Sequence, residues 1–256
     1  MNNQALFLNS KYVFNALLII LIMSLTKEDK LRMEVVEGAK AIFTKGLVET
    51  GEGNVSIRNG KKEEFFITPS FNQYSTLKKD EIVHLSFDGT PLSAGKLPST
   101  EAKMHIAIYK SRPKVQSIIH THSTFASMFS TIRKSIPIIM EEMYIFLGGS
   151  INVSDFGEAH TEEIGQVALN ALGTKNAALL ANHGVIVCGK SVDHAVKFAE
   201  LVEKLAKIYW GALQIGEPKT IPMEHLERFE KLYESLFANY PRSIRRKKVE
   251  YYNNKE

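Results

Sequence analysis

Two histidines separated by one residue, His120 and His122, directly follow an apolar segment that is typical of a buried strand. Side chains alternate between the two faces of an extended chain, so these two imidazoles are expected to point to the same side. A third histidine, His183, lies far along the chain between two further apolar segments. A fold that brings the three imidazoles together would hold a divalent metal with one position open for substrate. The sequence therefore predicts a catalytic metal site.

A carboxylate for such a site is available at Glu101, which follows Pro98, Ser99 and Thr100 at the expected start of a helix. Ser99 or Thr100 is expected to cap this helix. Two hydroxyls and the free backbone N–H groups of a helix start also suit a phosphate group. Taken alone, the segment predicts a capping motif. Beside a metal site, it favours a phosphate cradle next to a catalytic carboxylate.

One further histidine, His105, follows Glu101 by one helical turn. At that spacing its side chain lies on the same helix face as the carboxylate. It either lines the pocket or packs inside the protein, and packing is the favoured interpretation.

The fold class follows from the order of apolar patterns along the chain. Helical spacing predicts helices at 27–47, 124–132, 161–172, 192–213 and 223–237, besides the one that starts near Glu101. Apolar runs and alternation predict strands at 55–58, 65–67, 82–87, 115–119, 151–153, 177–181 and 185–187. Interspersed strands and helices indicate an α/β layered architecture. The hairpin-like spacing of several strands indicates a sheet that is not wholly parallel.

Composition places few further limits on the chain. Its 256 residues form one large domain or two small ones, and 44% hydrophobic residues are ordinary for a globular protein. Cys188 is the only cysteine, which excludes an intrachain disulfide and fits a reducing cytoplasm. It lies in an apolar run and is expected to be a buried hydrophobe rather than a nucleophile.

Both ends of the chain differ in character from the rest. Residues 1–25 are mostly apolar and form a leader peptide, a docked helix or an over-extended start with Met23 as the true initiator. The stretch is too short to predict a stable membrane insertion. Residues 241–256 are basic. They resemble a nucleic-acid or anionic-surface patch, but a flexible solvated tail is favoured, and no nucleic-acid partner is expected.

Several motifs in order resemble the class II aldolase/adducin family, closest to its L-fuculose-phosphate aldolase branch. The resemblance runs from about Lys27 to Leu236. It rests on the motifs Gly53-Asn54-Val55-Ser56, Ile67-Thr68-Pro69-Ser70, Gly95 to Glu101, Tyr109 to Pro113, His120-Thr121-His122 and Asn182-His183-Gly184.

The resemblance implies a three-layer αβα domain around a largely antiparallel sheet, over residues 26–240. It also implies a cytoplasmic homotetramer with active sites near subunit interfaces. One Zn²⁺ per subunit would be held by His120, His122 and His183, with Glu101 as the acid/base. The substrate phosphate would contact Asn54, Ser70, Ser99, Thr100 and the backbone N–H of Phe71.

The chain departs from the family pattern at two places. Phe71 stands where the family commonly has glycine, which would narrow or reshape the phosphate loop. Glu141 stands about where the branch carries a tyrosine, so Glu141 or Glu142 is a candidate for the aldehyde side of the site. A C-terminal aromatic that the branch contributes from a neighbouring subunit would be Tyr233 or Tyr240.

The implied activity is cleavage of a fuculose-1-phosphate-like ketose 1-phosphate to dihydroxyacetone phosphate and a small aldehyde, through an enediolate. A pentulose-phosphate 4-epimerase, a methylthioribulose-phosphate dehydratase and a sugar-acid decarboxylase are alternatives on the same site. A non-catalytic, adducin-like interaction protein is a further alternative, which predicts loss of the histidines. All three histidines and Glu101 are present.

Overall fold

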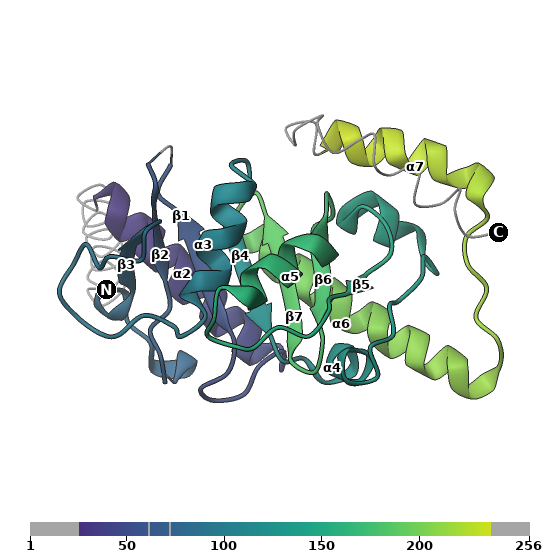
Figure 1. Ribbon diagram of the computed structural model, residues 1–256, viewed down its shortest axis with the longest axis horizontal. Helices are drawn as coiled ribbons and strands as arrows, with labels where there is room; N and C mark the ends of the chain where they lie inside the picture. Colours follow the sequence, from purple (N-terminus) through teal and green to yellow (C-terminus); the bar gives the residue numbers. More distant parts are fainter. Residues whose placement is uncertain (1–25, 61, 72, 237–256) are drawn as a thin grey trace, which may run out of the picture.

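The computed structural model describes residues 26–236 apart from positions 61 and 72 (Figure 1). Its elements follow the chain as α2 (Lys27–Thr44), β1 (Asn54–Arg58), β2 (Glu64–Ile67), η1 (Tyr74–Thr76), η2 (Lys79–Glu81), β3 (Val83–Ser86), α3 (Ala102–Ser111), β4 (Ser117–Thr121), α4 (Thr124–Thr131), η3 (Met143–Leu147), β5 (Asn152–Val153), α5 (Glu163–Leu172), β6 (Ala177–Leu180), β7 (Gly184–Gly189), α6 (Val192–Ile215) and α7 (Met223–Leu236). The expected apolar leader and basic tail lie outside the described residues. Within the described ranges, no helix has both the length and the hydropathy needed to cross a membrane.

One seven-stranded sheet forms the centre of the protein, in the order β3-β2-β1-β4-β7-β6-β5. Every neighbouring pair is antiparallel except β5 and β6, which run parallel. The largely antiparallel sheet expected from the sequence is therefore confirmed. Strands β1, β4 and β7 lie next to one another in the middle of the sheet.

Helices cover both faces of the sheet (Figure 1). Apolar side chains of α2, α4 and α6 pack on one face, and those of α3 and α5 pack on the other. Strand β7 shows the alternation, since Val185 and Val187 join the first core while Ile186 and Cys188 join the second. Because both faces of such a strand are buried, nearly every residue in it is apolar, and this explains the continuous apolar runs in the sequence. The three-layer αβα architecture is confirmed.

Helix α3 begins at Ala102 with Glu101 as its N-cap residue, so the prediction that Ser99 or Thr100 caps it was wrong. The Ser99 hydroxyl instead accepts a hydrogen bond from the backbone N–H of Glu101 at 3.3 Å. The Ser99 carbonyl accepts one from Ala102 at 3.0 Å. A turn closed by Ser99 thus precedes the helix and places Glu101 at its N-cap position.

Helix α5 also begins later than predicted, at Glu163 rather than at Thr161. The hydroxyl of Thr161 donates to the carbonyl of Glu158 at 2.7 Å. It therefore closes the preceding loop instead of capping the helix.

Helix α4 starts just after the histidine pair and is anchored by a carboxylate from α6. Glu203 accepts hydrogen bonds from the backbone N–H groups of Phe125 and Ala126 at 2.9 and 3.0 Å. Free N–H groups in the first turn of a helix favour a negative charge. This contact holds the chain that leaves β4 next to the long helix α6.

Candidate metal centre

The register of the central strands gathers the predicted site residues at one end of the sheet. Asn54 at the start of β1 lies directly opposite His120 near the end of β4. On the other side of β4, Thr121 pairs with Val185 of β7, two residues after His183. Residues far apart in the sequence therefore meet because three neighbouring strands begin or end together.

Two glycines allow this close approach. A Cβ atom at Gly184 would collide with the Thr121 carbonyl and lie 2.9 Å from the ring of His122. Gly53 has a φ of 63°, and a Cβ there would lie 2.6 Å from the carbonyl oxygen of His120. Both positions need a residue without a side chain.

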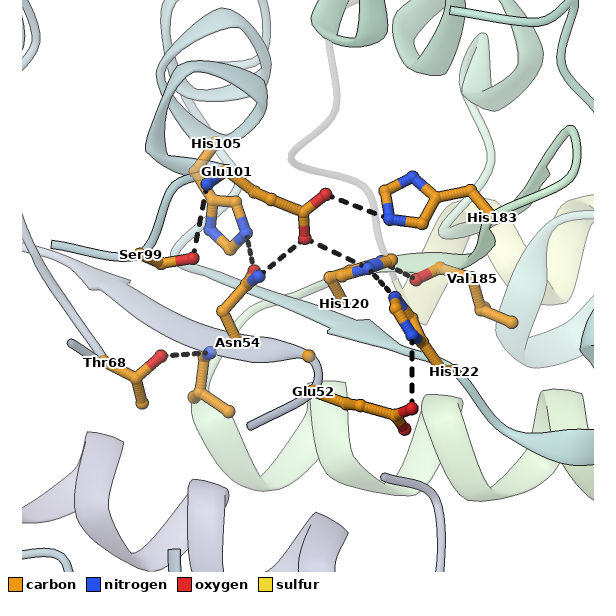
Figure 2. A network of polar contacts seen from close by, with 12 residues as sticks. Glu52, Asn54, Thr68, Ser99, Glu101, His105, His120, His122, His183 and Val185 are labelled. Carbon is orange, nitrogen blue, oxygen red and sulfur yellow. Dashed lines mark hydrogen bonds and ion pairs between the residues drawn. The ribbon is translucent and has the colours of Figure 1, made fainter. Parts of the chain in front are cut away.

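His120, His122 and His183 converge on one point (Figure 2). Each offers one ring nitrogen, and these three atoms lie within 4.8 Å of one another. The Nε2 atoms of His120 and His122 are 2.8 Å apart. The trio predicted from the sequence therefore forms a group that could hold a metal ion.

The ring of His120 is oriented by the backbone, because its Nδ1 lies 2.8 Å from the carbonyl oxygen of Val185. Burial lowers the pKa of His120 to about 3, although the negative charge of Glu101 acts in the opposite direction. Burial also lowers the pKa of His122, and His183 adds to that shift. Neutral rings are the form that binds metal.

The carboxylate of Glu101 faces the same point (Figure 2). Its Oε2 lies 3.1 Å from Nε2 of His120, and its Oε1 lies 3.1 Å from Nε2 of His183. Burial opposes ionisation, but His120, His183 and Asn54 outweigh it and hold the pKa of Glu101 below its ordinary value. Glu101 is therefore an ionised carboxylate in a buried position.

The donor set fits a divalent cation. With the N–H of His120 directed at Val185, its Nε2 presents a lone pair toward His122 at 2.8 Å. Beside this pair, Nε2 of His183 faces Oε1 of Glu101 at 3.1 Å. Buried polar atoms normally have partners, and a cation among the imidazoles would satisfy the facing lone pairs. Three imidazoles with a carboxylate nearby are a donor set that suits a divalent transition metal.

A pocket of about 260 Å³ opens beside this group. It is lined by His122, His183 and Glu101 and by every residue predicted to contact phosphate, namely Asn54, Ser70, Phe71, Ser99 and Thr100. The ring of His120 lies behind the pocket with no exposed surface. His122, His183, Glu101 and the predicted phosphate residues thus share one cavity, with His120 packed behind it.

The predicted phosphate residues have different local contacts. The Ser70 hydroxyl donates to the carbonyl of Pro98 at 2.7 Å. The side-chain amide of Asn54 already binds Glu101 and His105. Phe71 is 89% exposed and has a φ of 55°, the left-handed conformation that favours glycine. Their phosphate contacts stay predictions.

Three residues with polar side chains line the pocket and were not predicted from the sequence. Glu52 has its carboxylate 3.8 Å from Nδ1 of His122, and Tyr74 donates to the carbonyl of Gly53 at 2.6 Å. His160, which also has a positive φ, reaches the pocket from the loop before α5. Glu52 lies next to the Gly53-Asn54 motif, which was the available signal. No spacing in the sequence connects Tyr74 or His160 to the histidines.

The aldehyde-side candidates lie elsewhere in this chain. Glu142 pairs with Lys204 of α6 at 3.1 Å and lines a separate groove, and neither Glu141 nor Glu142 lines the metal-side pocket. Tyr233 donates to the carbonyl of Thr174 at 3.2 Å within its own chain. Tyr240 lies outside the described residues. The aldehyde-side role of Glu141 or Glu142 stays a prediction.

Comparison with known proteins identifies relatives of this fold and site. The family model for the class II aldolase and adducin N-terminal domain matches residues 33–210. A 5-methylthioribulose-1-phosphate/5-deoxyribulose-1-phosphate aldolase of Rhodospirillum rubrum is 34% identical over 82% of this chain and 93% of its own length. A 5-deoxy-D-ribulose 1-phosphate aldolase of Bacillus thuringiensis is 31% identical over 83% of this chain and 98% of its own. Among solved structures, an L-fuculose 1-phosphate aldolase superposes with a TM-score of 0.77 at 29% identity, over 80% of this chain and 96% of its own.

Proposed function

Because the chain belongs to the class II aldolase and adducin family, we propose that it is a Zn²⁺-dependent aldolase. Its substrate would be a ketose 1-phosphate similar to fuculose 1-phosphate. Its products would be dihydroxyacetone phosphate and a small aldehyde. The observation that carries the proposal is the convergence of His120, His122 and His183 on the carboxylate of Glu101 beside one pocket.

The chemistry requires a group that accepts negative charge when the carbon–carbon bond breaks. Zn²⁺ held by the three histidines would act as a Lewis acid toward that charge. Glu101 would carry the proton to and from the substrate carbon, since it is buried, ionised and adjacent to the histidines.

The phosphate end of the substrate would lie at the rim formed by Ser70, Ser99 and Thr100. These residues and the backbone N–H of Phe71 surround the same pocket as Glu101. Hydroxyls and N–H groups near the start of α3 suit a phosphate dianion. The phosphate would thereby fix the distance between the reacting carbons and the metal centre.

The relatives support a ketose 1-phosphate, because all three compared enzymes are named for one. Their sugars differ beyond the carbons that become dihydroxyacetone phosphate. The aldehyde is therefore the variable part of the proposal. The candidates are the aldehydes released from fuculose 1-phosphate, 5-deoxyribulose 1-phosphate and 5-methylthioribulose 1-phosphate.

A product assay with the purified, zinc-loaded protein tests the function. We expect dihydroxyacetone phosphate and a free aldehyde from at least one of these three ketose 1-phosphates. The same assay includes pentulose 5-phosphates as substrates. Isomerisation of a pentulose 5-phosphate without release of an aldehyde would indicate an epimerase, and formation of a diketone would indicate a dehydratase. A protein that binds no metal and acts on none of these sugars would support the adducin-like alternative.

Assembly is a separate part of the proposal. We expect a cytoplasmic homotetramer with one Zn²⁺ per subunit. Sedimentation analysis of the native protein would measure the assembly, and elemental analysis would measure the metal. A monomer that turns over substrate at the full rate would contradict active sites that depend on subunit interfaces.

A further inference from the structure

A chain of hydrogen bonds leads from Glu101 away from the pocket into the protein core. The side-chain nitrogen of Asn54 donates to Oε2 of Glu101 at 2.8 Å, and Oδ1 of Asn54 lies 2.5 Å from Nε2 of His105 (Figure 2). The other ring nitrogen of His105 lies 2.7 Å from the hydroxyl of Ser56. That hydroxyl lies 2.8 Å from the hydroxyl of Tyr109.

The donor and acceptor of every hydrogen bond in this series follow from the carboxylate of Glu101 at one end. A carboxylate only accepts, so Asn54 must turn its amide nitrogen to Glu101 and its oxygen to His105. An amide oxygen only accepts, so the ring proton of His105 is on Nε2. Its Nδ1 then accepts from Ser56, and the Ser56 oxygen accepts from Tyr109. Each group therefore has one defined role.

The arrangement arises from matching one helix face to one strand face. Glu101, His105 and Tyr109 follow one another at four-residue spacing at the start of α3 and along it, which places them on one face. Asn54 and Ser56 are two apart on β1 and point to the same side. The two faces meet in the layer between α3 and the sheet.

Burial restricts the side chains that form this series of hydrogen bonds. His105 and Ser56 have no exposed surface, and Asn54 is 2% exposed. Burial lowers the pKa of His105 to about 4, against the opposing effect of the Glu101 charge, so the ring is neutral near neutral pH. A neutral ring retains the lone pair that Ser56 needs, and water does not reach it.

We propose that His105 is a positioning residue for proton transfer by Glu101, acting through Asn54. It holds the Asn54 amide so that Oε2 of Glu101 is engaged, while Oε1, which faces Nε2 of His183 at 3.1 Å beside the pocket, receives the proton. This inference rests on the proposed aldolase function. It also explains why a polar histidine occupies the core rather than an apolar residue.

Two substitutions of His105 separate the two sides of its ring. In His105→Gln, the amide nitrogen reaches the position of Nε2 and can still donate to Asn54. In His105→Asn, the shorter amide stays near Nδ1, so the donor to Asn54 is lost while a polar group remains beside Ser56. Tyr109→Phe is the matched control, because it removes only the outermost hydroxyl of the chain.

The kinetic measurement is exchange of the carbon-bound hydrogen of dihydroxyacetone phosphate with D₂O by the zinc-loaded protein. We expect His105→Asn to lower the kcat of exchange by about tenfold to a hundredfold, as is usual for partners of a catalytic group, with KM and bound zinc little changed. His105→Gln and Tyr109→Phe should keep most of the rate. Rates that fall in all three variants in proportion to lost thermal stability would overturn the proposal.

A second measurement needs no substrate, metal or variant rate. Nitrogen-15 NMR of histidine-labelled, metal-free protein reports which ring nitrogen carries the proton, with the His105 signal assigned by its loss in His105→Gln. We expect a neutral His105 with the proton on Nε2. A proton on Nδ1, or a charged ring at neutral pH, would overturn the proposal even if His105→Asn fails to fold. A wild-type protein without any exchange activity would instead contradict the proposed function.

Discussion

Nδ1 of His120 lies 2.8 Å from the carbonyl oxygen of Val185 on the neighbouring strand β7. Because a carbonyl only accepts, the ring proton of His120 is on Nδ1, and the lone pair of Nε2 is directed at His122. A backbone hydrogen bond of this kind fixes the tautomer and orientation of a metal-binding imidazole. The sheet therefore orients His120 for its proposed role as a metal ligand before any metal binds.

Metal removal is expected to destabilise the protein, since a ligand that binds only the folded state adds to its stability. At a free zinc concentration about a hundred times the Kd, the gain is about 2.7 kcal/mol. Thermal unfolding with zinc and with a chelator measures the difference. His120→Ala is the control and should show little response to either addition. An equal response from both proteins would contradict zinc binding at His120.

Glu101→Gln is expected to lower kcat by about a hundredfold to ten-thousandfold, which is the usual contribution of a proton-transferring group. The three histidines remain, so the variant should still bind zinc. Glu52→Gln is the matched control, because its carboxylate lies at the pocket rim, 3.8 Å from Nδ1 of His122, whereas the carboxylate of Glu101 faces His120 and His183. Comparable losses of kcat in both variants would argue against Glu101 as the acid/base.

The grouping of the three histidines and the α/β layered fold class could be predicted from the sequence, because both depend on local patterns. Alternation along a strand relates His120 to His122, and apolar runs reveal strands covered on both faces. The αβα layers and the largely antiparallel sheet came from the family resemblance, and the structure confirms them. The implied roles of the site residues stay predictions.

Features that depend on register and tertiary contact were not predicted. Spacing does not reveal that Asn54 lies opposite His120 and donates to Glu101, while its phosphate contact, which the family resemblance implies, stays a prediction. Hydroxyl residues before α3 resemble caps, but a turn closed by Ser99 moves the helix start to Ala102. At the start of α4, the backbone N–H groups are bound by the carboxylate of Glu203, which belongs to α6 and is far away in the sequence.

Phe71→Gly is expected to raise the free energy of unfolding by up to about 1 kcal/mol, because a side chain in the left-handed region is disfavoured and glycine is not. Phe71 has a φ of 55° and a largely exposed ring, so little packing is lost. Phe71→Ala is the control, since it removes the ring but keeps the strained backbone. Denaturant unfolding should separate the two variants, and equal stabilities would exclude backbone strain at this position.

Glu203→Ala is expected to lower the free energy of unfolding by about 1 to 2 kcal/mol, the range for loss of a helix cap. Its carboxylate accepts two backbone hydrogen bonds at the start of α4. Glu200→Ala on the same helix is the control, because its partner Lys45 forms an exposed ion pair that contributes less than about 1 kcal/mol. If denaturant unfolding gave equal losses, the cap would have no special effect.

The stability of the metal-free protein should fall as the pH is lowered from about 6.5 to about 4. Burial lowers the pKa of His105 from its ordinary value of 6.5 to about 4. Between these values the unfolded chain binds a proton that the folded protein does not, so stability is complete above pH 6.5 and is lost on acidification. The difference of about 2.5 units, at about 1.4 kcal/mol per unit, corresponds to about 3 kcal/mol.

Burial also lowers the pKa values of His120 and His122. The contribution of His105 is therefore measured as a difference from His105→Gln, which has no titrating ring. Urea unfolding of both proteins from pH 7.5 to pH 4 would give the two profiles. We expect the stability advantage of the wild type to shrink by about 3 kcal/mol across this interval. Parallel profiles would mean that His105 accepts a proton as readily in the folded protein as in the unfolded chain, which would contradict a buried neutral ring held between Asn54 and Ser56.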